Sequence, residues 1–312
     1  MINGDWSSDV CSSDLYKPSQ GKGASESFKG GTFKGGNKNF KYSKNYRKKP
    51  YQKQFKPIKN KPSVKIAFLG GLNEIGKNIT MIECENDIIL VDCGMAFPDG
   101  DMLGVDLVIP DFTYIEQNQD KIRGIVLTHG HEDHIGGLPF LLGRVNIPIY
   151  GTALTLGLVG NKLKEHSLYN ESSLNRINAG ETIKLGCMSV EFIHVNHSIP
   201  DAVAFAIRTP AGTIVHTGDF KIDCTPITGD MIDLSAFARV GDEGVLALLA
   251  ESTNAERPGY TQTERTVSDS FDNLFRRAEH DRIIIATFAS NVNRVQQIIN
   301  CAEKYGRKVA FS

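Results

Sequence analysis

Cysteine is scarce and scattered in this chain. The sequence has 6 cysteines among 312 residues, and none forms a Cys-x-x-Cys pair of the kind that binds metal or carries redox chemistry. The chain also lacks an apolar run of about 18 residues, which a membrane-spanning helix requires. Its first residues lack the apolar core of a secretory signal. These absences argue against a disulfide framework and a membrane span, and they predict a cytoplasmic protein.

The net charge of -1 conceals a strong asymmetry along the chain. Residues 1–63 carry a net charge of +10, and residues 64–312 carry -11. Within the first segment, residues 1–15 resemble a sequence artefact, and we do not expect them to be part of a folded domain. Residues 16–63 form a Lys- and Gly-rich arm with interspersed Phe and Tyr, which we predict to be disordered because it cannot bury enough apolar surface.

Basic side chains interleaved with aromatic rings suit single-stranded nucleic acid, because the charges follow the phosphates and the rings stack on bases. The basic arm is therefore predicted to contact RNA or a ribosome. The alternative is a solvated tail that only aids solubility.

Four residues with metal-binding side chains fall within six positions, in the stretch from His129 to His134. Three are histidines, and the fourth, Asp133, offers a hard oxygen. The apolar residues before them predict a strand, and the Ile135–Leu138 segment predicts a tighter turn of chain. Because a strand that breaks into a turn can direct all four side chains inward, this loop is predicted to serve two metal ions.

Further ligands are expected at later strand ends. His197 follows one predicted strand, and Asp219 follows another, where its two carboxylate oxygens could bridge two cations. For His194 and His216 we favour supporting roles, with His216 hydrogen-bonded beside the ligands.

The order of predicted elements indicates an α+β protein. Short helices are expected at residues 111–117 and 139–143, and longer ones at 154–165, 261–279 and 291–305. Strands are expected at residues 64–69, 78–84, 88–91, 125–127, 148–150, 181–195, 202–209, 212–216, 245–250, 282–287 and 308–311. The last part has the βαβ rhythm of a parallel sheet, which predicts a second domain.

These residues together resemble the metallo-β-lactamase superfamily, through the His-x-His-x-Asp-His cluster, His197 and Asp219. Longer motifs narrow the resemblance to the ribonuclease J family and its β-CASP nucleases. They are Gly70-Gly71-Leu72-Asn73-Glu74-Ile75-Gly76-Lys77-Asn78, Val91-Asp92-Cys93-Gly94, the segment from Gly104 to Phe112, His216-Thr217-Gly218-Asp219-Phe220-Lys221, and the segment from Glu251 to Gly259.

The resemblance implies a four-layer αββα sandwich into which a β-CASP α/β domain is inserted. The corresponding boundaries are residues 64–260 for the metallo-β-lactamase domain and 261–312 for the start of the β-CASP domain. The resemblance also implies two Zn²⁺ ions, with Mn²⁺ or Mg²⁺ as substitutes. One ion would be bound by His129, His131 and His197. The other would be bound by Asp133 and His134, with Asp219 between the two ions. The catalytic carboxylates would be Asp133, Asp219 and Glu251, with Glu251 orienting a ligand and Asp92 supporting the loop.

The resemblance also implies a ribonuclease of RNA processing and decay. A hydroxide held between two cations would attack RNA phosphodiesters, by 5′-3′ exonuclease and by endonuclease action. Ser290 and Asn291 could bind a phosphate at a helix start, or Ser290 could simply cap that helix. The family forms homo-oligomers or complexes with a paralogue, and contact with a ribosome or degradosome is expected.

Two other functions stay open at this point. The chain could be a metallo-β-lactamase-fold hydrolase of a small thioester or lactam, although the basic arm and the last βαβ segment disfavour this. It could also be a non-catalytic RNA-binding subunit, which the intact histidine cluster disfavours. The sequence stops directly after a predicted strand, so we expect an incomplete second metal site, low stability and little activity for residues 1–312.

Overall fold

The computed structural model describes residues 62–311. The predicted basic arm and the segment 1–15 lie outside the described residues. Those that are described belong to one compact unit. Among them, no helix combines the length and the hydropathy that crossing a bilayer demands.

The first sheet has six strands in sequence order, β1-β2-β3-β4-β5-β6. The first three strands are antiparallel, and β4 to β6 then add in parallel. The strands are β1 (Val64–Gly70), β2 (Ile79–Cys84), β3 (Asp87–Val91), β4 (Ile122–Val126), β5 (Ile149–Gly151) and β6 (Leu174–Arg176).

The second sheet has five strands in the order β11-β10-β9-β8-β7. Its pairs are antiparallel except β10 with β11, which run parallel. The strands are β7 (Thr182–Leu185), β8 (Met188–His194), β9 (Val203–Thr209), β10 (Gly212–His216) and β11 (Val245–Leu249).

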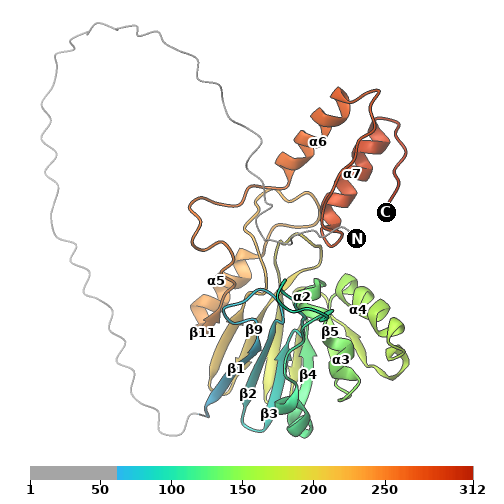
Figure 1. Cartoon of the computed structure of the whole chain (residues 1–312). Coiled ribbons are helices and arrows are strands. Elements are labelled where there is room, and N and C mark those ends of the chain that lie inside the picture. Colours follow the sequence, from blue (N-terminus) through green and yellow to red (C-terminus); the bar gives the residue numbers. More distant parts are fainter. Residues whose placement is uncertain (1–61, 312) are drawn as a thin grey trace, which may run out of the picture. The chain divides into compact units, whose positions relative to one another are not determined.

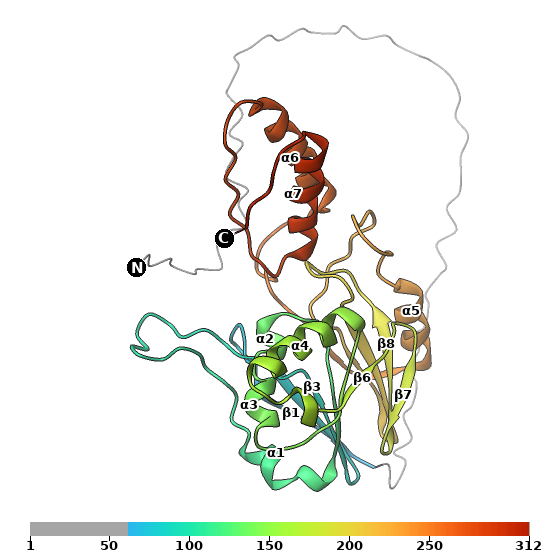
Figure 2. The ribbon, with the colours of Figure 1, turned by 90° about the vertical axis from the view of Figure 1, so that its right-hand side faces the viewer.

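Helices cover the outer face of each sheet. The first sheet is covered by α1 (Thr113–Gln117), α3 (Leu138–Leu142) and α4 (Ala153–Glu165), and the second by α5 (Leu234–Glu243). Figures 1 and 2 show α3 and α4 on one flank of the paired sheets and α5 on the other. The predicted α+β class and αββα layering are confirmed. Two 3₁₀ turns, η1 (Gln119–Lys121) and η2 (Tyr169–Glu171), complete this part.

The strands alternate their side chains between two cores, because successive residues of a strand point to opposite faces. On β3, Ile88 and Leu90 join the core beneath the helices, whereas Ile89 and Val91 join the core between the sheets. Both faces are apolar, so the strand reads as an unbroken hydrophobic run. This explains why the sequence predicted the central strands well.

After β11, two helices pack together, namely α6 (Arg265–Arg277) and α7 (Val292–Lys304). Figure 2 shows the two helices side by side, and they share a small core that contains Phe271, Phe275 and Ala302. The strands predicted at residues 282–287 and 308–311 are wrong, because neither segment forms a strand. Within residues 62–311, neither segment has a partner strand, and a β-strand requires a ladder of hydrogen bonds with a neighbour.

Candidate metal centre

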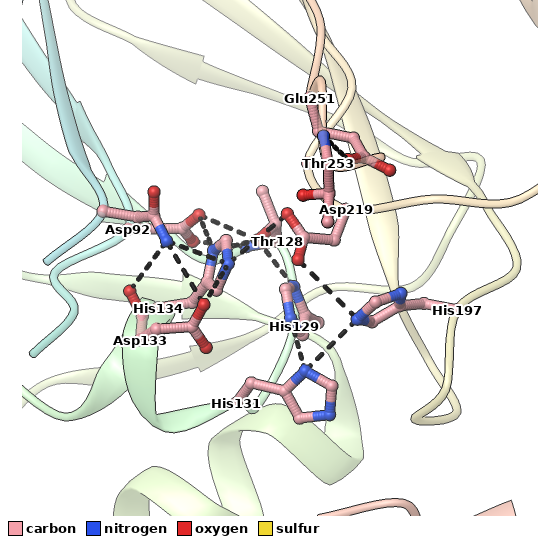
Figure 3. Close-up of polar contacts among 12 residues, drawn as sticks. Asp92, Thr128, His129, His131, Asp133, His134, His197, Asp219, Glu251 and Thr253 are labelled. Carbon is pink, nitrogen blue, oxygen red and sulfur yellow. Dashed lines mark hydrogen bonds and ion pairs between the residues drawn. The ribbon is translucent and has the colours of Figure 1, made fainter. Parts of the chain in front are cut away.

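The ligand-type side chains meet where several strands end. The loop after β4 carries His129 and His131 and turns into α2 (Glu132–Ile135), which carries Asp133 and His134. His197 follows β8, and Asp219 follows β10. Figure 3 shows these side chains converging, although they come from both sheets.

His129, His131 and His197 form the first converging group. Nε2 of His129 lies 3.0 Å from Nδ1 of His131, which lies 3.2 Å from Nε2 of His197. Ring nitrogens this close need a proton or a cation between them, because unshared lone pairs repel. The geometry therefore brings together the three histidines predicted for one metal ion.

Burial keeps these three rings neutral. It lowers the pKa of His129 well below its ordinary value, and the neighbouring His134 adds to this. Burial also lowers the pKa of His131. It lowers that of His197 to about 4, against the opposing effect of the Asp219 carboxylate. Neutral imidazoles at pH 7 leave lone pairs for a cation, so this donor set fits Zn²⁺.

The second converging group consists of His129, His134 and Asp219. Asp133, which the sequence placed at this ion, approaches the same ring: its Oδ2 lies 3.5 Å from Nε2 of His134, as does Oδ1 of Asp219. Asp219 also reaches toward the first group, with Oδ2 3.8 Å from Nε2 of His197. Its two oxygens thus face both groups, which is the arrangement a bridging carboxylate needs.

The second group requires a positive charge at its centre. Burial disfavours the charged form of His134, but Asp92, Asp133 and Asp219 outweigh this and raise its pKa well above the ordinary value. Burial works against ionised Asp219 too, yet His134 and His197 lower its pKa. A divalent cation would supply a positive charge in the same surroundings, where two carboxylates face the ring.

Asp92 and Thr128 hold the two ligand histidines in place. Oδ2 of Asp92 lies 2.8 Å from Nδ1 of His134 and accepts a 2.8 Å hydrogen bond from the Thr128 hydroxyl. The same hydroxyl lies 3.0 Å from Nδ1 of His129. Because both Nδ1 atoms face these partners, the Nε2 atoms are left for a metal ion. Asp92 has a φ of 62°, a costly backbone conformation of the kind found at functional sites.

The turn that carries Asp219 is held by His216 and by a glycine. Nδ1 of His216 accepts a 3.1 Å hydrogen bond from the Gly218 amide, so the ring supports the turn from inside. Gly218 has a φ of +57°, and a Cβ there would lie 2.9 Å from Thr128. His194, for which a supporting role was expected, has its Nε2 2.9 Å from the Asp230 carbonyl.

Glu251 makes contacts other than the expected one. Within the described residues, its carboxylate accepts a 2.9 Å hydrogen bond from the Thr253 amide, and no hydrogen bond joins it to a histidine. Its own amide donates to the Thr217 hydroxyl at 3.2 Å. In this arrangement Glu251 stabilises the turn after β11 beside the Asp219 turn (Figure 3).

Ser290 and Asn291 lie at the start of α7. Burial lowers the pKa of His131, whereas the backbone of Ser290 acts to raise it, so this helix start borders the first histidine group. The helix is capped by Asn291, whose Oδ1 accepts a 3.1 Å hydrogen bond from the Arg294 amide. The cap is therefore Asn291 and not Ser290, and the Asn291 amide oxygen is already engaged.

Two residues of the site had no assigned role in the sequence analysis. Thr128 stands directly before the first histidine, where a polar side chain in an otherwise apolar run was a usable signal. Asn78 ends the glycine-rich motif that follows β1, and its Nδ2 lies 3.2 Å from Nε2 of His134. Nothing in its local sequence points to that contact.

Two family models match the part of the chain that contains these residues and the segment after it. A model described as "Metallo-beta-lactamase superfamily" matches residues 72–253, which is more than half of the chain. The chain belongs to the metallo-β-lactamase superfamily. A second model, "Ribonuclease J, beta-CASP domain", matches residues 280–312.

Curated relatives carry the name that the motifs suggested. The chain is 50% identical over 254 residues to "Ribonuclease J 1" of Streptococcus pyogenes. It is 48% identical to "Ribonuclease J" of Helicobacter pylori and 45% identical to "Ribonuclease J2" of Bacillus subtilis. Each match covers 81% of this chain. The resemblance to ribonuclease J is thereby confirmed.

The matches extend over only part of these relatives. They cover 45%, 37% and 46% of the three proteins, so the chain spans less than half of their length. Among solved structures, a protein of unknown function from Enterococcus faecalis matches with a TM-score of 0.59 at 19% identity. That match covers 77% of this chain and 63% of the other, and it supports the fold.

Proposed function

We propose that this protein is a metal-dependent ribonuclease that hydrolyses phosphodiester bonds of single-stranded RNA. The observation that carries the proposal is the pair of ligand groups that share His129 and face Asp219 from two sides. A segment similar to the ribonuclease J β-CASP domain follows in the same chain. Two cations, when bound, would lower the pKa of a water molecule and offset the charge of a phosphate.

The residues of the chain would divide the work as follows. His129, His131 and His197 would hold one cation, and His134 with Asp133 would hold the other, with Asp219 between them. Zn²⁺ suits these ligands, and Mn²⁺ or Mg²⁺ would be accepted with different affinity. The helix start at Ser290 borders His131, which supports a role in positioning a phosphate near the metal centre.

Further parts of the proposal concern the whole protein. Its relatives' names support RNA as substrate. We also propose 5′-3′ exonuclease and endonuclease action in RNA processing and decay. We further propose a cytoplasmic protein, which suits the free cysteines of the described part. Assembly as a homo-oligomer or with a paralogue, and contact with a ribosome or degradosome, complete the proposal.

The test is cleavage of a 5′-monophosphorylated single-stranded RNA by the purified whole protein with Zn²⁺ or Mn²⁺. We expect cleavage that chelation abolishes and that His131→Ala eliminates. His166→Ala serves as the matched control, because His166 lies at the end of α4 and packs on Phe140. Hydrolysis of a thioester without cleavage of RNA would contradict the proposal. RNA binding that is unchanged by His131→Ala, with no cleavage, would indicate a non-catalytic subunit.

A further inference from the structure

The side chain of Asn78 lies against two of the proposed ligands. Its Nδ2 is 3.1 Å from the Asp133 carbonyl oxygen and 3.4 Å from Oδ2 of the same residue. It is also 3.2 Å from Nε2 of His134. No other side-chain amide among the described residues contacts either of these two ligands.

The backbone of Asn78 is tied to the same place. Its amide donates a 3.0 Å hydrogen bond to the Asp133 carbonyl, and its own carbonyl accepts one of 2.9 Å from the Gly94 amide. Asn78 directly precedes β2, whose strand pairing with β1 and β3 fixes its position. The sheet therefore holds the backbone of Asn78 beside the ligand loop, and the side-chain amide starts from this fixed point.

Two glycines lie close to Asn78. A Cβ at Gly71 would lie 2.4 Å from Oδ1 of Asn78, and a Cβ at Gly94 would lie 2.9 Å from its backbone nitrogen. Two glycines thus admit the asparagine at close range. A lysine or arginine would add a positive charge beside the cation site, whereas a neutral amide contacts Asp133 without adding charge.

We propose that Asn78 is a positioning residue of the second cation site, holding Asp133 and His134 in place for the cation. It donates to both the backbone and the carboxylate of Asp133, and its Nδ2 lies 3.2 Å from Nε2 of His134. Asp92 holds the opposite nitrogen of that ring, so the two residues define its orientation together. This inference rests on the proposed two-metal function. It attributes part of the cation affinity of the second site to Asn78.

The test compares Asn78→Leu and Asn78→Asp, both close to asparagine in size, with Asn146→Asp as control. Asn146 is exposed, and its amide contacts only the Glu171 carbonyl among the described residues. Zn²⁺ affinity is measured for each site by competition with a chromophoric chelator, using the full chain. Thermal unfolding is followed with and without Zn²⁺.

We expect Asn78→Leu to weaken the second site by about 10- to 100-fold while the first site keeps its affinity. Asn78→Asp should lower the melting temperature of the metal-free protein, because the new carboxylate faces Asp133. It should also strengthen Zn²⁺ binding at the second site and enlarge the stabilisation by Zn²⁺. Asn146→Asp should change neither quantity.

Unchanged affinity at both sites in both Asn78 variants would overturn the inference. An equal loss at both sites would do so too, since it would indicate a general effect on folding. These outcomes are separate from a failure of the proposed function. A protein that binds two Zn²⁺ ions with the expected dependence on Asn78 but does not cleave RNA would leave the inference intact and refute the ribonuclease.

Discussion

Oδ2 of Asp92 and Nδ1 of His134 lie 2.8 Å apart, and both side chains are buried. Asp92 comes from the end of β3, and His134 comes from α2, so this contact joins the ligand loop to the first sheet. It leaves Nε2 of His134 directed at Asp133 and Asp219. The orientation of a ligand thus depends on a residue that is 42 positions away in the sequence.

Asp92→Asn should weaken metal binding at the His134 group by about 10- to 100-fold, because the amide no longer stabilises the Nδ1–H tautomer as a carboxylate does. Binding at the group of His131 and His197 should change less. Titration with Zn²⁺ against a chelator of known affinity resolves the two sites. Equal affinities in the variant and the parent protein would contradict the role of Asp92 in orienting His134.

Thr128→Val should destabilise the protein by about 1–3 kcal/mol, because valine has nearly the same shape but leaves Nδ1 of His129 without its partner and removes one of the hydrogen bonds that Asp92 accepts. Thr128→Ser keeps the hydroxyl, so its metal affinity should lie closer to that of the parent protein than the affinity of Thr128→Val does. Denaturant unfolding gives the free energy, and metal titration gives the affinity. If serine recovers no more affinity than valine, the methyl group and not the hydroxyl is what matters at this position.

Gly94→Ala should disturb the ligand loop. The added Cβ would lie 1.6 Å from the carbonyl oxygen of Asp133, and backbone atoms cannot move aside as a flexible side chain can. We expect a loss of at least about 1–3 kcal/mol in unfolding free energy and reduced metal content. Gly100→Ala is the matched control, because nothing lies within 4 Å of its added Cβ. Similar behaviour of the two variants in thermal unfolding would argue against this close packing.

The proposed metal centre could be predicted largely from sequence, because the residues that converge there are dense in one loop or belong to recognisable motifs. His129, His131 and His134 stand within six positions, and His197 and Asp219 follow predicted strands. The supporting residues could not be found in this way. One asparagine among many reaches Asp133 only because the register of β2 brings together positions 55 residues apart.

The fold, too, could be predicted from sequence in some parts and not in others. Strands with both faces buried, such as β3, read as apolar runs, and they form where a neighbour supplies a ladder. The segment 282–287 has the same composition and failed as a prediction. Its Ile283 and Ile285 pack against the α6 and α7 core, while Ile284 is 87% exposed. The predicted burial was therefore wrong as well, because a strand and its burial depend on a partner that a local pattern cannot specify.

Glu191 should make the stability of the fold depend on acid pH. It lies on β8, where it accepts hydrogen bonds from Arg208 on β9 and from Arg239 on α5. Burial would raise the pKa of Glu191, but the two arginines outweigh this and lower it below its ordinary value of 4.5. Because the folded state holds the carboxylate ionised, this stabilisation is fully present above pH 4.5 and is lost as the pH falls through the lower folded-state value.

Glu191→Gln should therefore lower the unfolding free energy at pH 7 by about 1 kcal/mol, a modest amount because both arginines are partly exposed to solvent. The difference between variant and parent should shrink as the pH is lowered below 4.5, since the parent then loses the same interaction. Urea unfolding across pH 3–7 measures this, with Glu165→Gln at the exposed end of α4 as control. A difference that stays constant over that range would mean that Glu191 contributes through packing and not through its charge.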